Sequence, residues 1–234
     1  MTAEFSLLLG TAATLGLVHT LLGPDHYVPF VAMARARQWS NRRTLMITLL
    51  SGIGHVASSV VIGMVGLLLG VELLKLTALE SVRGEIAGWL LFGFGLAYMI
   101  WGIRRAVKQA SSRPHSHGLI THKHPGGAFT HSHEGSHERQ ANITPWIIFT
   151  IFVFGPCEPL IPLLMVPAAR ADAFSVLAVA LTFSVFTIGT MLTLVYASVR
   201  GLAKVNLGFM ERYSHALAGF VVAACGAGIQ FLGL

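Results

Sequence analysis

The chain has 234 residues, of which 54% are hydrophobic and only 11% are charged, with a mean hydropathy of +0.69. Soluble proteins carry about 25% charged residues, so this composition excludes a water-soluble enzyme and a disordered chain. The net charge of +6 does not indicate nucleic-acid binding, because basic residues of membrane proteins gather on the cytoplasmic side. The two cysteines, Cys157 and Cys225, are too few for a disulfide framework or a CxxC metal knuckle.

Six apolar segments predict six transmembrane helices, since about 20 apolar residues cross a hydrocarbon core about 30 Å thick. The first segment, 5–34, is longer than a span needs and is interrupted by Gly23, Pro24, Asp25 and His26, so we expect a broken helix there. The other five segments are uninterrupted by charge runs: 44–70, 85–103, 145–168, 173–199 and 214–234. The predicted fold class is therefore an all-α integral membrane protein.

Lys and Arg residues predict how this protein is oriented. If the spans alternate in direction, thirteen basic residues fall on one side and three, Lys75, Arg83 and Arg170, on the other. The crowded side is expected to be cytoplasmic, which places both termini outside the inner (plasma) membrane. Residues 104–143 then form a cytoplasmic loop between two halves, 1–103 and 144–234, of three helices each.

The two halves resemble each other. Glycines spaced by seven occur in the third and sixth predicted helices, which places each triplet on one helix face and favours close approach of a neighbouring helix. The two triplets are Gly88, Gly95 and Gly102, and Gly219, Gly226 and Gly233. The segments GPDHYVPF and GPCEPLIPL are a second correspondence, and they predict helices 1 and 4 broken at Gly-Pro. An odd number of helices in each half makes the two copies inverted repeats, the plan of secondary transporters whose broken helices form a midplane site.

Ionisable residues within membrane spans are costly and are usually functional. Aligning the two Gly-Pro segments sets Asp25 against Cys157 and His26 against Glu158, and His55 comes from the middle of the second predicted helix. Imidazole with carboxylate suits Ni²⁺, Co²⁺, Zn²⁺ or Fe²⁺, and a thiolate makes such a site softer. The predicted midplane metal site comprises His19, Asp25, His26, His55, Glu158 and Cys157.

Other polar residues of the spans have structural interpretations. His215, near a predicted cytoplasmic helix end, is interpreted as a packed helix-terminus residue. Ser58 and Ser59 are expected to bond back to their own helix or across to a neighbour.

The loop is rich in histidine and contains glycine and proline, so it can fold around metal ions without imposing one fixed geometry. We interpret it as a cytoplasmic metal buffer or sensor; the alternative is a flexible solvated linker. Its histidines are His115, His117, His122, His124, His131, His133 and His137.

The motifs HTLLGPDH and GHVASSVV and the two three-helix halves resemble the nickel/cobalt transporter (NicO) superfamily, in particular its UreH-like membrane proteins grouped with urease accessory functions. The larger permeases of this family carry a His-x4-Asp-His signature that binds metal, whereas His19 to Asp25 has one more residue here, with Gly-Pro before the aspartate. The family's Gly-His-Ser-type motif matches Gly54, His55, Ser58 and Ser59 loosely. The resemblance implies that His19, Asp25, His26 and His55 are metal ligands.

The resulting hypothesis is a transporter and not an enzyme: it takes up Ni²⁺ or Co²⁺ as substrate, has no prosthetic group, and has a cytoplasmic metallochaperone as a partner. No GxxxxGK[ST] motif for nucleotide binding is present. Three alternatives remain open: efflux through the same site, export of an anion or amino acid, and a thiol/disulfide electron carrier like those of cytochrome biogenesis. The last needs two symmetric cysteines, but Cys157 has Asp25 as its counterpart.

Overall fold

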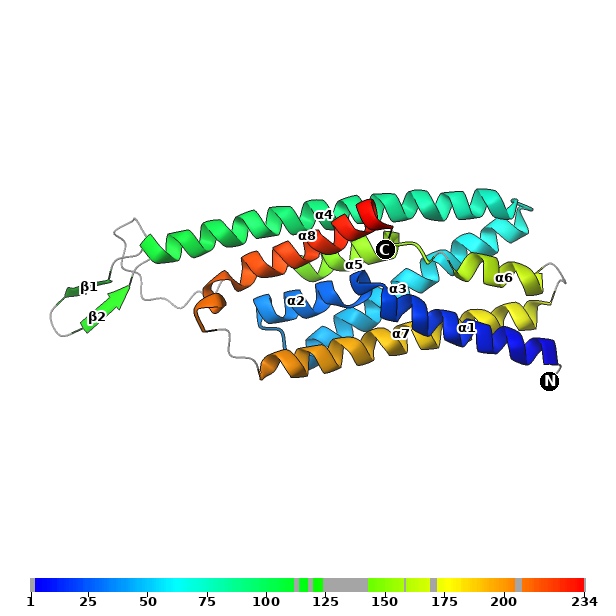
Figure 1. Cartoon of the computed structure of the whole chain (residues 1–234), viewed down its shortest axis with the longest axis horizontal. Helices are drawn as coiled ribbons and strands as arrows, with labels where there is room; N and C mark the ends of the chain where they lie inside the picture. The colour runs from blue at the N-terminus through cyan, green and yellow to red at the C-terminus, as the bar shows by residue number, and fades with distance from the viewer. Residues whose placement is uncertain are drawn as a thin grey trace.

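The computed structural model describes residues 3–111, 114–117, 120–123, 143–157, 159–168, 172–204 and 208–233. The described chain is helical except for one hairpin, β1 (Pro114–His117) with β2 (Ile120–Lys123), in which His115 lies opposite His122. The helices run along one long axis (Figure 1). They are α1 (Ala3–Leu22), η1 (Pro24–His26), α2 (Val28–Arg37), α3 (Asn41–Leu68), α4 (Leu73–Ser111), α5 (Thr144–Phe154), α6 (Leu160–Ala168), α7 (Ala173–Ala203), η2 (Gly208–Tyr213) and α8 (Ser214–Leu232).

Five of the described helices are long and apolar enough to cross a membrane: Ala3–Leu22, Asn41–Gly66, Leu73–Lys108, Ala173–Ala203 and Glu211–Leu232. Many of their large apolar side chains point outward, as in Val61, Val185 and Phe220, which are 60%, 66% and 58% exposed. An outward apolar surface is stable against lipid and not against water. The protein is therefore a multi-pass membrane protein.

The helix α4 differs in length from the predicted third span. It begins at Leu73 and not at residue 85, and it continues past residue 103 to Ser111, into the predicted loop. Charged residues near its start interrupt the apolar run, which is why hydropathy alone placed that stretch outside the membrane. The charges of Glu80 and Arg83 lie one helical turn apart and pair with each other inside the protein.

The predicted close approach at the glycine faces is confirmed, and it occurs within one chain between α4 and α8. These two helices lie side by side along one edge of the molecule (Figure 1). A Cβ atom added at Gly95 would contact the backbone of Ala223, and one added at Gly219 would contact the backbone of Met99. Gly233 does not belong to this face: a Cβ atom added there would have no described atom within 4 Å, and its φ of +66° ends α8.

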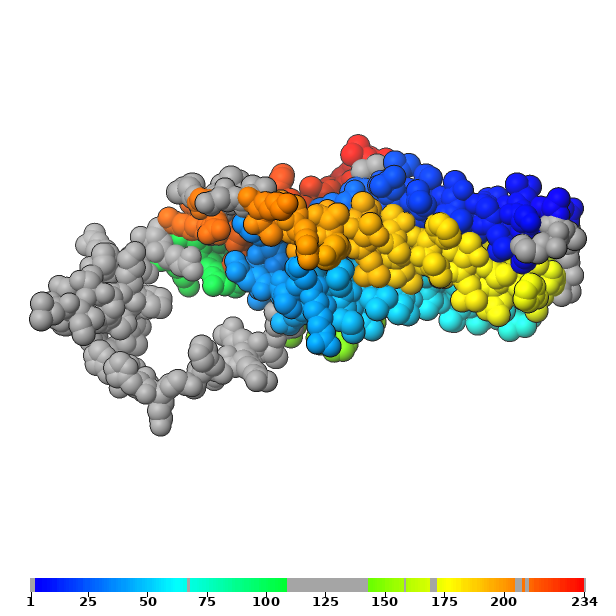
Figure 2. Space-filling view, turned by 90° about the horizontal axis from the view of Figure 1, so that it is seen from below, coloured from blue at the N-terminus to red at the C-terminus, as the bar shows by residue number. Residues whose placement is uncertain are grey.

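The helix α1 packs along α7, as the space-filling view shows (Figure 2). A Cβ atom at Gly16 would lie 2.9 Å from the carbonyl oxygen of Phe183, so this contact also needs a glycine. On the loop side of the bundle, where α4 ends and α5 begins, a tightly packed core fills the interior. It comprises among others Phe30, Met33, Tyr98, Ile148, Phe152, Met191 and Val195.

Candidate metal site

Two of the site histidines lie where α1 ends. The amide of Gly23 donates to the carbonyl of His19 (3.0 Å), and Pro24, which has no N–H, starts the short η1 turn. This turn brings His26 back to His19, with 4.6 Å between the two ring centroids. A Cβ atom at Gly23 would lie 2.6 Å from Nδ1 of His26, so only glycine allows the turn to fold this tightly.

The carboxylate of Asp25 orients His26. Its Oδ1 atom lies 3.2 Å from Nδ1 of His26, which is only 4% exposed. Because a carboxylate only accepts hydrogen bonds, Nδ1 carries a proton, and in the neutral imidazole Nε2 is then the nitrogen with the lone pair. Metal-binding histidines are commonly held in this way: one ring nitrogen donates to a carboxylate, and the other, Nε2, faces the metal.

His55 reaches the same place from the middle of α3. Its Nδ1 lies 3.3 Å from the carbonyl oxygen of Phe152 at the end of α5, and its ring centroid is 5.1 Å from that of His26. A carbonyl also only accepts, so Nδ1 is again the donor and Nε2 of His55 has an available lone pair. The imidazole is 3% exposed.

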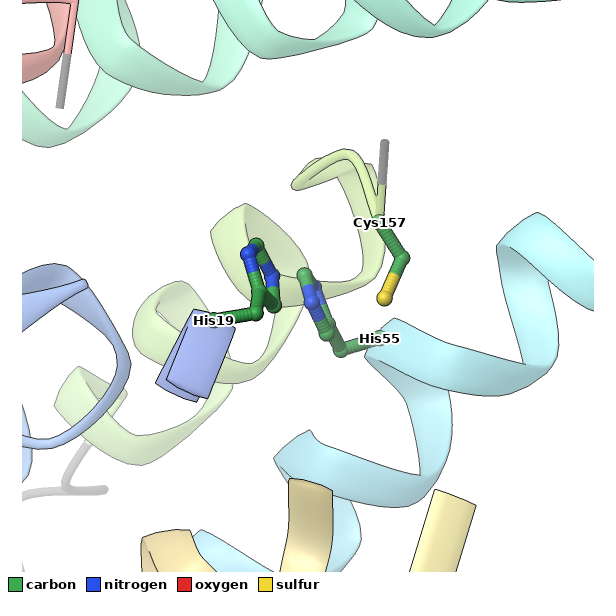
Figure 3. Close-up of side chains that lie close together, drawn as sticks. All are labelled: His19, His55 and Cys157. Atoms are coloured by element: carbon green, nitrogen blue, oxygen red, sulfur yellow. The ribbon is translucent and has the colours of Figure 1, made fainter. Parts of the chain in front are cut away.

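Cys157 completes a group of three ligands from three parts of the chain (Figure 3). It follows Pro156 between α5 and α6, is fully buried, and directs its thiol toward His55 (Figure 3). One ligand atom from each of His19, His55 and Cys157 lies within 4.8 Å of the other two. Metal–nitrogen and metal–sulfur bonds are about 2.0–2.3 Å long, so two atoms bound to one ion lie at most about 4.6 Å apart. The three atoms are therefore close to the spacing that a single metal ion needs, and a small contraction of the group would complete it.

Three nitrogen atoms of this site have no hydrogen-bond partner among the described residues. They are the Nε2 atoms of His19, His26 and His55, and all three are buried. Leaving a buried polar atom unpaired costs about 1–3 kcal/mol, so three together need an explanation. Coordination of a cation by the lone pairs would supply the missing partner.

A cavity of about 720 Å³ gives access to these imidazoles. Its lining includes His19, Asp25, His26 and His55 at one end, and Ser81 and Glu85 of α4 with Gln230 of α8 elsewhere. Ser81 and Glu85 are exposed. The α4 residues that line the cavity, 81–91, belong to the half of this helix remote from the loop. The cavity therefore lies against the half of α4 that is remote from the loop.

Sequence reasoning missed a second group of buried charges beside the site. Glu80 is 1% exposed and pairs with Arg83, and together they contact Ser58, Ser59 and the backbone around Cys157. The signal that could have found them is the Glu-x-x-Arg spacing, which puts opposite charges on one helical face.

The structure describes only some of the remaining predicted residues. Glu158 lies outside the described residues, as do His124, His131, His133 and His137 of the loop. His115, His117 and His122 lie on the β1–β2 hairpin. His215 shares a hydrogen bond of 2.8 Å with the hydroxyl of Tyr98, in agreement with its predicted packing role.

Scans against protein-family models and searches of curated proteins and of solved structures found no match to this chain.

Proposed function

We propose that this protein transports a divalent transition-metal ion, Ni²⁺ or Co²⁺, across the cell's inner membrane. One observation carries the proposal: ligand atoms of His19, His55 and Cys157 lie within 4.8 Å of one another inside a bundle of apolar helices. His26, oriented by Asp25, stands beside both histidines as a fourth donor. Groups of this kind are rarely buried within a membrane protein without a functional reason.

The donor set favours a borderline transition metal. Imidazole nitrogen with one thiolate suits Ni²⁺, Co²⁺ and Zn²⁺, whereas Mg²⁺ and Ca²⁺ take oxygen ligands. Asp25 supplies negative charge next to the ligands without being needed as one. The resemblance to nickel/cobalt transporters selects Ni²⁺ or Co²⁺ within this chemical group.

The architecture we propose has six spans arranged as two inverted repeats, with helices 1 and 4 broken at Gly-Pro. The first broken span is α1 with η1 and α2, and the second is α5 with α6. Each interruption occurs at a Gly-Pro pair. Both contribute ligands in this proposal: His19 and His26 come from the first, and Cys157 comes from the second. Irregular backbone is tolerated at this depth where it lines a cavity or a binding site.

The position of the cavity supports uptake by alternating access. Basic residues gather at the loop side, for example Arg37, Arg104 and Arg200, so we assign this side to the cytoplasm and both termini to the outside. In this assignment the half of α4 that lines the cavity is the outward half, and the packed core around Phe30 and Ile148 lies on the inward side. We assign the loop histidines a buffering role for the delivered metal, before it passes to a cytoplasmic metallochaperone.

Cellular metal content tests the proposed function. Cells expressing the wild type are expected to accumulate Ni²⁺ or Co²⁺, and both His19→Ala and Cys157→Ser should abolish the gain because each removes one of three clustered ligands. Cys225→Ser, at the chain's other thiol, is the matched control and should accumulate metal normally. Elemental mass spectrometry across Ni, Co, Zn, Fe and Mn is the measurement. A fall in one metal would contradict uptake, and no change in any would contradict metal transport.

A substitution that changes none of the candidate ligand residues should also weaken metal binding. In Gly23→Ala the new methyl group would lie 2.6 Å from Nδ1 of His26 and 2.9 Å from Oδ1 of Asp25, and so would displace both. We expect Ni²⁺ affinity to fall by about 10–100-fold, the effect of disturbing a ligand's orienting partner. Gly10→Ala is the control: Gly10 lies on α1, before the turn, and a Cβ atom added there would have no described atom within 4 Å. If equilibrium dialysis gave the same Ni²⁺ affinity for both variants, the role assigned to the turn would be wrong.

A further inference from the structure

The break between α5 and α6 leaves backbone groups without helical partners. The last carbonyls of α5 have no following helical turn to bond to, and Pro156 and Pro159 offer no N–H. On the other side of the break, the amide of Cys157 precedes α6, whose first amide, from Leu160, donates to the carbonyl of Cys157 (3.0 Å). These groups lie within the membrane-spanning bundle, where each one left unpaired is costly.

Arg83 of α4 satisfies the α5 side of this break. Its Nη2 atom donates to the carbonyl of Val153 (3.0 Å) and to that of Gly155 (3.3 Å). The positive guanidinium therefore lies at the negative, carboxyl-terminal end of a helix, the favourable placement for a cation. The same nitrogen donates to the hydroxyl of Ser58 (2.7 Å), one turn along α3 from His55.

Glu80 satisfies the α6 side. Its Oε2 atom accepts from the amide of Cys157 (3.1 Å) and from the hydroxyl of Ser59 (2.9 Å), while Oε1 pairs with Arg83. A carboxylate at the amino-terminal side of a helix is again the favourable charge. The Ser59 hydroxyl also lies 3.2 Å from the Cys157 amide, so two hydrogen-bonding groups, one from α3 and one from α4, converge on this amide.

We propose that Glu80 and Arg83 are positioning residues that hold the break in the conformation presenting the Cys157 thiol to the metal site. The inference rests on the proposed function for its metal readout, but the geometry concerns Cys157 itself. The pair is nearly enclosed, with side-chain exposures of 1% and 11%, and its hydrogen bonds to Val153, Gly155 and Cys157 are all to backbone. A buried ion pair is by itself a poor source of stability, which favours a role in specifying one conformation.

The spectrum of bound Co²⁺ tests this proposal, because thiolate ligation gives a near-ultraviolet charge-transfer band while imidazole ligation keeps the visible bands. The protein is the full chain with the seven loop histidines replaced by glutamine. In Arg83→Ala and in Glu80→Gln we expect the charge-transfer band to disappear and the visible bands to remain. Added guanidinium should restore the first band in Arg83→Ala. Lys75→Gln, at an exposed charge on the same helix that does not line the cavity, should leave both bands unchanged.

A variant that keeps both charges moves the break without removing a buried charge, a change that can unfold the protein. In Gly84→Ala the new methyl group would lie 2.8 Å from Cγ of Pro156 and so would push the break away. It should lose the thiolate band as the charge variants do. A thiolate band that persists in Arg83→Ala, Glu80→Gln and Gly84→Ala would overturn the positioning role.

A metal-free measurement separates this inference from the proposed function. In a Cys225→Ala background, the rate at which a membrane-permeant maleimide alkylates Cys157 reports how often the break opens. Removing a hydrogen-bonded charge should raise this rate by about tenfold or more in Arg83→Ala. If the wild type shows neither Co²⁺ band but Cys157 is still alkylated faster in Arg83→Ala, metal transport is rejected and the positioning role is kept. An unchanged alkylation rate would reject the positioning role whatever the metal result.

Discussion

Replacing His55 by alanine is expected to lower the affinity for Ni²⁺ by at least about 100-fold, since it removes a ligand and not merely an orienting partner. His55 stands at the centre of the site: it belongs to the three-ligand group and its ring is 5.1 Å from that of His26. The carbonyl oxygen of Phe152 lies 3.3 Å from Nδ1 of His55 and so fixes the orientation of the imidazole. Titration calorimetry on purified protein, with the loop histidines replaced by glutamine, measures the effect.

His215→Ala is the matched control for this substitution. His215 is a partly buried histidine of α8 that bonds to Tyr98 and does not line the cavity. Its loss should leave the Ni²⁺ affinity within about twofold of the wild type, because removing one neutral hydrogen bond outside the site acts on stability and not on the ligands. If His55→Ala bound Ni²⁺ as tightly as His215→Ala does, the described ligand set would be wrong.

The second large effect is expected at the glycine contact between α4 and α8. In Gly219→Ala the added methyl group would overlap the backbone of Met99, which unlike a flexible side chain cannot turn away. The two helices must then separate, and overpacking of this kind costs about 1–3 kcal/mol in soluble cores. We expect at least this loss in the free energy of unfolding, measured by denaturation with dodecyl sulfate in mixed micelles.

Gly93→Ala provides the comparison on the same pair of helices. Gly93 lies on α4, is exposed, and has no atom within 4 Å of its would-be Cβ. Alanine favours a helix over glycine by about 1 kcal/mol, so this variant should be as stable as the wild type or more so. Destabilisation of both variants to the same extent would mean that the loss comes from helix propensity and not from the contact.

Much of the helical framework was predictable because lipid imposes a simple rule on sequence. Long apolar runs around His55 and across residues 173–199 are helices in the structure, and glycines seven residues apart identified the faces on which α4 and α8 meet. Gly233 repeats the spacing but ends α8, since a periodicity alone cannot tell a packing glycine from a terminating one. The start of α4 was misplaced because hydropathy counts charges and does not show that Glu80 and Arg83 neutralise each other.

For the candidate site, the sequence indicates which residues to consider, whereas their geometry comes from the structure. The sequence indicates His19, His26, His55 and Cys157, because ionisable groups are costly within a membrane span and because two of the spans are interrupted at Gly-Pro. Their convergence could not be derived from sequence, because it depends on how two separate turns lie against the middle of α3. Which of them forms the three-ligand group, His19 and His55 with Cys157, depends on rotamers set by neighbours such as Phe152 and Gly23.

X-ray absorption at the metal edge of the Ni²⁺-loaded protein tests the central claim most directly. The sample is the full chain with the seven loop histidines replaced by glutamine, so that bound metal reports only on the membrane site. One equivalent of Ni²⁺ with imidazole scattering and a sulfur shell is the expected result, and Cys157→Ser should lose the sulfur shell while keeping the imidazoles. A metal shell of oxygen alone, or no bound Ni²⁺, would contradict a metal site at His19, His55 and Cys157.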